Sequence, residues 1–458
     1  MNSLAFQSGT LVFEGGAPPD FLRKWLLADS RGKVFRARAC DYSNIVLAAR
    51  DHDFPLDDRV KAFSPEHFSL NRPLAPRPHQ RMALDAWKNS GFRGVAALPT
   101  GAGKSYLAVM AIAKLQRPAL VVAPTLDLVE QWRRLLFDFF GCDIGVLAGG
   151  EKLLLPLTVA TYDSAVLQME FIGNRFALLV CDECHHLPGP VFRAAAEQAI
   201  APYRLGLSAT PECESPERFE LLKELLGPVV AEVQVSELEG KVLSPYRVIS
   251  VPVALSKEER MEYDLSRTVY RDFVRRCRVD FSAADGWKKF LIACSRSAEG
   301  RAAFDAYLRQ KEIACRGESK IGAVWDILRK HCGERILVFT ADNATAYRIG
   351  REFVLPVLTC RTRPAERRDM LQKFRDSRYP VLVTSKVLNE GVDVPEAAVG
   401  VVVSGSGSVR EHVQRLGRIL RAAPGKRAVL YELVSADTAE ESTSRRRREH
   451  AAYAGKVL

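Results

Sequence analysis

Residues 98–105 read Leu-Pro-Thr-Gly-Ala-Gly-Lys-Ser, a glycine-rich turn that follows the β-type run Gly94–Leu98. Glycines in such a turn let backbone N–H groups close around phosphate oxygens, and the following helix presents its positive end there. The residues expected to contact phosphate are Pro99, Thr100, Gly101, Ala102, Gly103, Lys104 and Ser105. This pattern predicts a nucleotide-binding loop between a strand and a helix of an α/β domain.

A second motif supplies the acidic half of such a site. Asp182 and Glu183 close the apolar run 177–180. With a nucleoside triphosphate bound, we expect Lys104 to lie against the β- and γ-phosphates and Ser105 to ligate Mg²⁺. Asp182 would then hold the metal through water, and Glu183 would orient the attacking water. Cys181 and Cys184 also form a Cys-x-x-Cys pair, which is open to a zinc or redox interpretation, but we expect Cys181 to be a buried strand residue.

Composition narrows the class of protein. The chain has 458 residues, a formal charge of +11 and ten cysteines without a disulfide framework. No apolar run approaches the roughly 18 residues that span a bilayer, and the first residues do not resemble a signal peptide. We therefore expect a soluble cytoplasmic protein, nucleoid-associated in a prokaryote, with no membrane contact. The net positive charge favours a polyanionic partner, most simply nucleic acid.

The sequence contains two blocks, and within each block short apolar runs alternate with helical stretches. The first block contains Gly94–Leu98, Ala119–Ala123, Leu157–Thr161, Ala177–Cys181 and Arg204–Leu207, and the second contains Arg335–Phe339, Pro380–Thr384, Ala398–Ser404 and Ala428–Leu433. Such runs predict buried parallel strands in two tandem α/β domains that face each other across a cleft. The motifs fall at the carboxyl ends of the strands, where ligands bind in such sheets.

Apolar runs, prolines and charged residues indicate the domain boundaries in the rest of the chain. Near the N-terminus, the runs Gly9–Phe13 and Lys33–Ala39 flank a helical candidate at Phe21–Leu27, and prolines 73, 76 and 78 mark a linker. We expect a small separate α+β domain at 1–72, α/β domains at 73–238 and 239–437, a helical insertion at 256–312 and a basic tail at 438–458. The tail carries Arg445–Arg448, interpreted either as a solvated helix end or as a further contact with nucleic acid.

The insertion is basic and rich in aromatic residues. Arg267, Arg271, Arg275 and Arg278 recur at the spacing of one helix face, with tyrosine, phenylalanine and tryptophan interleaved. A basic stripe beside aromatic rings suits a nucleic-acid backbone and its bases. A solvated helix face over a small aromatic core is the alternative.

Three further segments fit a site shared between the two blocks. Arg77 and Gln80 precede the phosphate loop, and the Gln80 amide could pair with adenine. Ser208 and Thr210 follow a strand and could link the nucleotide to the rest of the cleft. In the second block, Gln414, Arg418 and Arg421 share one helix face, from which the arginines could neutralise the γ-phosphate.

Taken in order, these segments resemble the superfamily 2 helicases and, within them, the XPB helicases. The resemblance rests on residues 77–80, 98–105, 123–126 with 131–132, 160–165, 182–188, 208–210, 388–395, 404–408 and 414–421. It implies a 3′–5′ ATP-dependent DNA helicase or translocase in DNA repair, with ATP and Mg²⁺ as cofactors. It further implies two RecA-like domains, an N-terminal domain that senses distorted DNA, and a helical thumb at the insertion.

The resemblance also suggests residue roles. It places Gly391 and Asp393 with the nucleotide, Thr125 and Thr161 on the DNA backbone, and His185 between hydrolysis and movement. Relatives carry an Arg-Glu-Asp triplet that is implicated in strand separation. Here the corresponding stretch, 211–215, reads Pro-Glu-Cys-Glu-Ser. Because the triplet is implicated in strand separation, we expect its absence to affect unwinding more than ATP hydrolysis.

Rival interpretations stay open at this point. One is a double-stranded DNA translocase without unwinding, which the missing triplet favours. Another is a DNA-binding ATPase that delivers a nuclease partner, and an RNA helicase is a third. We expect a monomer that contacts DNA mainly through phosphates, and hence with little sequence specificity.

Overall fold

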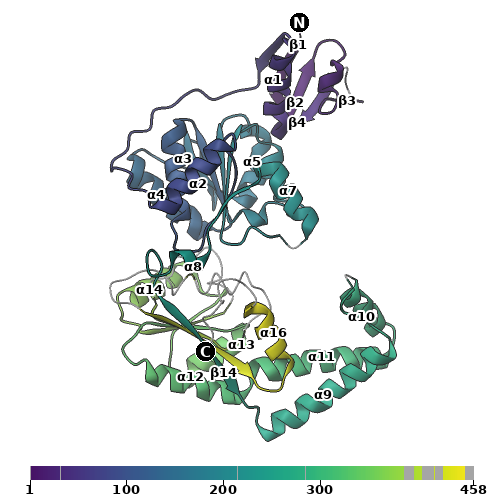
Figure 1. Ribbon diagram of the computed structural model, residues 1–458, viewed down its shortest axis with the longest axis vertical. Coiled ribbons are helices and arrows are strands. Elements are labelled where there is room, and N and C mark those ends of the chain that lie inside the picture. Colours follow the sequence, from purple (N-terminus) through teal and green to yellow (C-terminus); the bar gives the residue numbers. More distant parts are fainter. Residues whose placement is uncertain are drawn as a thin grey trace. The chain divides into compact units, whose positions relative to one another are not determined.

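The computed structural model describes residues 2–30, 32, 34–213, 215–283, 285–385, 397–404, 417 and 427–448. For residues 446–448 only the backbone is described. The described chain forms two compact units, which meet in sequence between Glu237 and Leu238. Unit one holds an N-terminal domain and a first α/β domain, and unit two holds a second α/β domain with a helical arm (Figure 1). Within the described residues, no helix is long and apolar enough to cross a membrane.

The N-terminal domain is a five-stranded sheet with one α-helix. Its strands are β1 (Asn2–Gln7), β2 (Thr10–Glu14), β3 (Leu27–Asp29), β4 (Val34–Arg38) and β5 (Leu56–Arg59), in the order β3-β4-β2-β1-β5. Only β1 and β5 pair in parallel. The helix α1 (Tyr42–Asp51) buries Tyr42 and Ile45 in the domain core. The strands expected at 9–13 and 33–39 are thus present as β2 and β4.

The helix expected at Phe21–Leu27 is wrong. The structure has a single 3-10 turn, η1 (Asp20–Leu22), followed by further turns and then by β3. Leu22 and Leu26 are both buried, so their spacing imitates a helix face. The segment turns once and then becomes a strand, because residues 27–29 pair with β4.

The N-terminal domain is packed against the first α/β domain. Ile200 of the larger domain belongs to the core of the smaller one. Arg38 pairs with Glu224 at 2.7 Å. The connecting segment is also held, since Ala62 N donates to the Asn174 carbonyl and Asn71 N to the Phe139 carbonyl. The small domain, expected from the sequence to be separate, therefore shares one unit with the first α/β domain.

The first α/β domain is built on an eight-stranded sheet. Its strands are β6 (Arg93–Ala97), β7 (Ala119–Ala123), β8 (Gly145–Ala148), β9 (Glu151–Leu153), β10 (Leu157–Thr161), β11 (Leu178–Asp182), β12 (Tyr203–Ser208) and β13 (Val229–Glu232), in the order β13-β6-β12-β11-β7-β10-β8-β9. All pairs are parallel except β8 with β9. The helices are α2 (Pro78–Asn89), α3 (Lys104–Leu115), α4 (Leu126–Phe140), α5 (Tyr162–Ile172), α6 (Ala194–Glu197) and α7 (Pro216–Leu226). The predicted α/β fold with a parallel sheet is confirmed in this domain.

The second α/β domain has a six-stranded, all-parallel sheet. Its strands are β14 (Tyr246–Val253), β15 (Ile336–Phe339), β16 (Val357–Leu358), β17 (Val381–Thr384), β18 (Val399–Val402) and β19 (Ala428–Ser435), in the order β14-β19-β18-β15-β17-β16. This domain also contains the helices α12 (Glu318–Lys330), α13 (Asn343–Glu352) and α14 (Pro364–Arg375). The short helix α8 (Val235–Leu238) lies at the point in the sequence where the two units meet. The second predicted parallel sheet is thus also confirmed.

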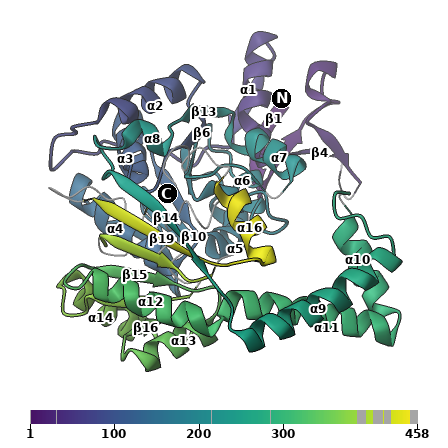
Figure 2. The ribbon, with the colours of Figure 1, turned by 60° about the horizontal axis from the view of Figure 1, so that its bottom comes forward.

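A helical arm leaves the second domain after β14. It consists of α9 (Lys257–Arg276), α10 (Gly286–Ser295) and α11 (Ala298–Arg316), with α9 and α11 side by side and α10 at the far end (Figure 2). Phe273 and Phe290 are buried in the arm, and Tyr270 and Tyr307 pack against them. Most of the interleaved aromatic rings therefore form the core of the arm, although Phe281 and Trp287 keep over two-fifths of their surface exposed.

The basic stripe is shorter than expected. The helix α9 ends at Arg276, and Arg278 follows in a left-handed turn with φ +49°. The expectation that Arg278 shares a helix face with Arg267, Arg271 and Arg275 is therefore wrong. The three remaining arginines lie on α9.

The helix α16 (Ala439–Arg448) is docked on the second domain at its start. Lys320 Nζ lies 2.6 Å from Glu440 Oε2, and both side chains are almost fully buried. The same carboxylate accepts from Ser435 N, and Lys320 also donates to the Val403 carbonyl. Ser444, a turn further along, donates to Glu432. The segment that the sequence suggested was a polar tail thus begins as an anchored helix.

Candidate nucleotide-binding site

The phosphate loop connects β6 to α3 at the carboxyl edge of the first sheet. Gly101 and Gly103 adopt φ values of +87° and +86°, in the left-handed region that favours glycine. A Cβ atom on Gly103 would come within 2.3 Å of the Gln80 amide nitrogen. Lys104 and Ser105 are the first two residues of α3, so the positive end of this helix faces the loop.

Lys104 and Glu183 form an ion pair. Lys104 Nζ lies 3.1 Å from Glu183 Oε1, and the two side chains are only 10% and 13% exposed. The lysine of the loop and the carboxylate at the end of β11 are therefore together, as the motifs predicted. A bound triphosphate would compete with Glu183 for the lysine, because both present anionic oxygens to one ammonium group.

Asp182 is held by two aromatic side chains, neither of which was among the expected site residues. Trp132 Nε1, on α4, donates to Asp182 Oδ2 at 2.8 Å. The Tyr162 hydroxyl, on α5, donates to the Asp182 backbone carbonyl at 3.0 Å. Burial, together with the charge of Glu183, raises the pKa of the Asp182 carboxyl to about 6. Lys104 and the Trp132 hydrogen bond oppose that rise, because both favour the ionised form.

The backbone turns sharply after Asp182. Glu183 has φ +45°, a left-handed conformation that costs a non-glycine residue about 1–2 kcal/mol. Its backbone N–H donates to Asp182 Oδ1 at 3.0 Å. Such strain persists only where the surroundings enforce it, and here it directs consecutive carboxylates into one site.

Residues in the first turn of α2 support the phosphate loop through hydrogen bonds. The Gln80 side chain accepts from Arg77 N at 2.9 Å and donates to the carbonyls of Ala102 and Gly103 at 3.2 and 3.3 Å. His79 Nε2 donates to the Ala102 carbonyl at 2.8 Å. The Gln80 amide, expected to read adenine, is thus hydrogen-bonded to the loop itself.

A chain of polar contacts leads from Glu183 to the end of β12. His185 Nδ1 lies 3.6 Å from Glu183 Oε2 and 3.2 Å from Ser208 Oγ. Ser208 Oγ in turn accepts from Thr210 N and donates to the Thr210 carbonyl. These are the three residues expected to couple hydrolysis to movement, and they lie in one contact path.

Four of the predicted DNA-contacting residues have local partners. Thr125 Oγ1 caps α4 by accepting from Leu128 N, and Thr161 Oγ1 caps α5 by accepting from Ser164 N. Arg275 pairs with Asp272 at 3.2 Å, and Arg267 donates to the Tyr263 hydroxyl. Gln414, Arg418, Arg421, Gly391 and Asp393 lie outside the described residues.

The group of residues fits a magnesium triphosphate. The loop offers φ-positive glycines, a lysine and a helix start, and the Asp182 carboxylate and the Ser105 hydroxyl are oxygen ligands of the kind that Mg²⁺ prefers. Mg²⁺ commonly takes few protein ligands and completes its shell with phosphate and water. Among the described residues, no group of three or more His, Cys, Asp or Glu could hold a metal by itself. Cys181 and Cys184 are both fully buried, as expected for Cys181 on its strand.

Some supporting residues were missed, and only a weak signal pointed to them. His79 and Trp132 stand inside segments that carry the family resemblance, but nothing in their spacing indicates which group they contact. Tyr162 follows β10 directly, which places it at the same sheet edge as the phosphate loop. Knowledge of the strand order, in which β7 lies between β10 and β11, is what would have brought Trp132 and Tyr162 to Asp182.

Three family models match the chain. Residues 4–60 match the Xeroderma pigmentosum group B helicase damage recognition domain, 73–213 match Type III restriction enzyme, res subunit, and 308–457 match ERCC3/RAD25/XPB C-terminal helicase. The chain is also similar to the solved Hef helicase domain of Pyrococcus furiosus, with a TM-score of 0.56 and 20% identity over 81% of this chain and 97% of that one. That likeness concerns the fold.

Curated relatives have similar sequences. The "DNA 3'-5' translocase XPB2" of Sulfurisphaera tokodaii is 41% identical over 91% of this chain and 94% of its own length. The "DNA 3'-5' helicase XPB" of Mycobacterium tuberculosis is 32% identical over 81% of this chain and 63% of its own. The XPB subunit of "General transcription and DNA repair factor IIH" of Drosophila melanogaster is 27% identical over 92% of this chain and 51% of its own.

The paired parallel sheets and the phosphate loop facing an acidic strand end define an ATPase of the superfamily 2 helicase class. Within that class, the chain belongs to the XPB family.

Proposed function

We propose that this chain is an ATP-dependent 3′–5′ DNA translocase or helicase that acts in DNA repair. The observation that carries the proposal is the pairing of Lys104 with Glu183, beside a buried Asp182, in a member of the XPB family. Repair is proposed because the Drosophila relative is named as a subunit of a transcription and repair factor.

Different residues of the site bind the phosphates, orient the attacking water and hold the metal. Lys104 leaves Glu183 and binds the β- and γ-phosphates, while the loop N–H groups hold the remaining phosphate oxygens. Freed from the lysine, Glu183 orients a water molecule toward the γ-phosphorus. Ser105 directly and Asp182 through water would hold Mg²⁺, which would neutralise charge on the phosphate oxygens. Trp132 keeps the Asp182 carboxylate in position throughout.

Arg418 and Arg421, with Gln414, are proposed to complete the nucleotide site from the second α/β domain, together with Gly391 and Asp393. Arginine contacts on the transferred phosphoryl group contribute roughly 10³–10⁵ in rate. The path through His185, Ser208 and Thr210 is proposed to report the state of the γ-phosphate. Thr125, Thr161 and the α9 arginines are proposed to grip the DNA backbone, which carries no sequence information.

A second candidate function is translocation on double-stranded DNA without strand separation. It is favoured by the stretch after Thr210, where Pro211 and Cys213 flank Glu212 in place of the basic and acidic residues of the triplet. Delivery of a nuclease partner by a monomeric motor is compatible with this variant.

The test compares ATPase rate and movement on the same substrates. ATP turnover is measured with single-stranded, duplex and forked DNA and with RNA of equal length, alongside strand displacement and triplex displacement. The proposal expects stimulation by DNA over RNA and 3′–5′ polarity. Triplex displacement without strand displacement selects the second candidate. ATP turnover that DNA leaves unchanged contradicts both.

A further inference from the structure

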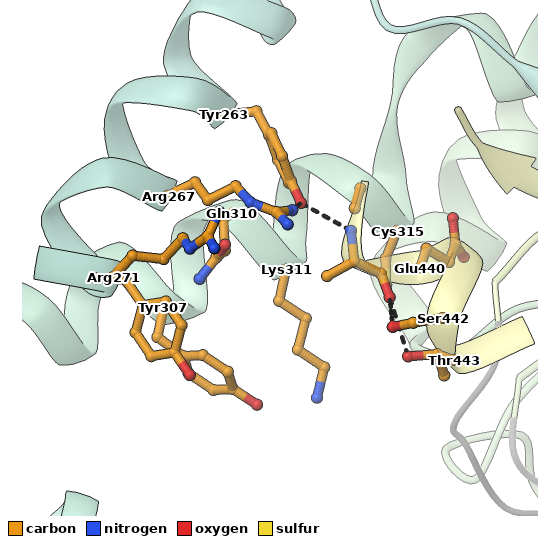
Figure 3. A pocket seen from close by; sticks show the side chains of 13 residues that line it. Tyr263, Arg267, Arg271, Tyr307, Gln310, Lys311, Cys315, Glu440, Ser442 and Thr443 are labelled. Carbon is orange, nitrogen blue, oxygen red and sulfur yellow. Dashed lines mark hydrogen bonds between the residues drawn. The ribbon is translucent and has the colours of Figure 1, made fainter. Parts of the chain in front are cut away.

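A cavity of about 540 Å³ lies at the base of the arm, wholly within unit two. Its walls come from α9, α11 and the first turns of α16, which are distant in sequence (Figure 3). The volume lies in the range of small-molecule sites, roughly 300–1,000 Å³. The phosphate loop contributes no residue to it.

One wall is cationic. Arg267, Arg271 and Lys311 line the cavity. Neither Arg271 nor Lys311 forms an ion pair with any residue in the described part of the chain. Glu440 also lines the cavity, but its carboxylate is compensated by Lys320 at 2.6 Å. The cavity therefore carries excess positive charge, which favours an anionic occupant.

Gln310 points into the same space. The residue is only 6% exposed, and its amide makes no hydrogen bond with any residue that the structure describes. Its amide atoms are not among the fully buried polar atoms that lack a partner in the described structure, so they are accessible from the cavity. In Figure 3 this amide lies beside the guanidinium groups of Arg267 and Arg271. It offers both a donor and an acceptor, which the edge of a nucleobase can satisfy.

Aromatic surface completes the cavity. Tyr270 and Tyr307 line it, with ring centroids 5.4 Å apart. Both rings are half-buried, so each keeps a surface that a flat ligand can contact. Stacking of a base on an aromatic side chain is worth roughly 1–3 kcal/mol.

We propose that this cavity binds a nucleoside phosphate, separately from the nucleotide at the phosphate loop. The phosphate contacts Arg271 and Lys311, and the base stacks on the tyrosines and pairs with Gln310. A free mononucleotide and a single nucleotide unit of a strand share this chemistry. The proposal goes beyond the motor function, because it needs neither hydrolysis nor movement.

The geometry differs from that of a simple backbone groove. A backbone contact needs cations along an open face and does not require an amide beside them. Here an amide and two aromatic rings line the same cavity as the cations, which is the composition of a site that recognises a base.

The test measures binding of deoxythymidine monophosphate to the full chain by calorimetry. We expect Lys311→Ala to weaken binding about tenfold and Gln310→Leu about fivefold, as for the loss of one charged and one neutral contact. Gln310→Leu removes only an unpartnered amide, so melting temperature should hold. Lys288→Ala, an equal charge change on α10 outside the cavity, should bind like the unmodified chain.

Two further comparisons locate the site and its source. Lys104→Ala should leave monophosphate binding unchanged; loss of binding in that variant would place the ligand at the phosphate loop and overturn the proposal. An oligo-dT strand binding more tightly than its abasic counterpart, with the difference abolished by Gln310→Leu, identifies a strand nucleotide as the source. Tight monophosphate binding without that difference identifies a free nucleotide. Inorganic phosphate binding as well as the nucleotide, or variants indistinguishable from the unmodified chain, would overturn the proposal.

Discussion

Trp132 Nε1 lies 2.8 Å from Asp182 Oδ2, so an indole on α4 fixes the carboxylate proposed to hold Mg²⁺. The tryptophan is 2% exposed, and its ring has no room to swing away without disturbing the core. Residues that orient a metal ligand typically change metal affinity by roughly 10–100-fold when they are replaced.

Trp132→Phe should raise the Mg²⁺ concentration needed for half-maximal ATPase rate by about tenfold. The ring stays apolar, but the Asp182 oxygen loses its donor and the carboxylate can rotate. Magnesium titrations of ATP turnover check this. Trp87→Phe is the matched control, because Trp87 is equally buried and donates at 2.8 Å to the Arg204 carbonyl. An equal Mg²⁺ shift in both variants would show a general packing effect.

Gln80→Ala separates two roles for one amide. If Gln80 chiefly supports the phosphate loop through the Ala102 and Gly103 carbonyls, its loss should raise KM about tenfold for ATP and for other nucleoside triphosphates alike. If the amide instead turns to adenine when ATP binds, the penalty should fall on ATP alone. Steady-state kinetics with ATP, GTP and UTP distinguish the two.

Lys104→Ala should lower ATP turnover by at least roughly 10²–10³-fold, because the γ-phosphate loses its cation. Glu183→Gln should keep ATP bound while turnover stops. Lys114→Ala, an exposed lysine at the other end of α3, serves as the control. Near-normal DNA-stimulated turnover in Glu183→Gln would remove Glu183 from the reaction.

His185→Asn and Ser208→Ala should uncouple movement from hydrolysis. Both interrupt the path from Glu183 to Thr210, so DNA stimulation of ATP turnover should drop about tenfold while basal turnover persists. Since the residues act in series, the double variant should be no worse than either single one. Additive losses in translocation assays would argue that they act independently.

Arg271→Ala with Arg275→Ala should weaken DNA binding and reduce the slope of log affinity against log salt by about 1.8, which is 0.9 for each phosphate contact. Asp272→Ala is an informative control, since it releases Arg275 from its ion pair. That variant should bind DNA at least as well as the unmodified chain. Unchanged salt dependence in the double arginine variant would leave the arm without a backbone contact at these positions.

Most strands of the two α/β sheets were predictable because buried parallel strands are continuous apolar runs. The strands β8, β9, β13, β14 and β16 were not among the expected runs. The runs 119–123 and 157–161 are β7 and β10 to the residue. The loop and the acidic pair were predictable for a related reason, since parallel strands bring their carboxyl ends to one edge. The local sequence pattern was therefore enough to identify those site residues that lie directly at the end of a strand.

Contacts between distant segments were not predictable. Trp132 reaches Asp182 across 50 positions, and Gln80 reaches Gly103 across 23. Periodicity describes one helix at a time and cannot show which face meets which strand. The placement of Arg278 failed differently, because a non-glycine residue with positive φ ended the helical path without any glycine or proline to signal it.

The buried ion pair between Lys320 and Glu440 bears on how the protein can be shortened. Trimming the chain before α16 removes the carboxylate but leaves the ammonium group sealed beside the Val403 carbonyl. Leaving one buried charge without its partner typically lowers the free energy of unfolding by about 3–5 kcal/mol. The minimal folded motor thus extends through this helix, and an affinity tag is better appended beyond residue 448 than used to replace what precedes it.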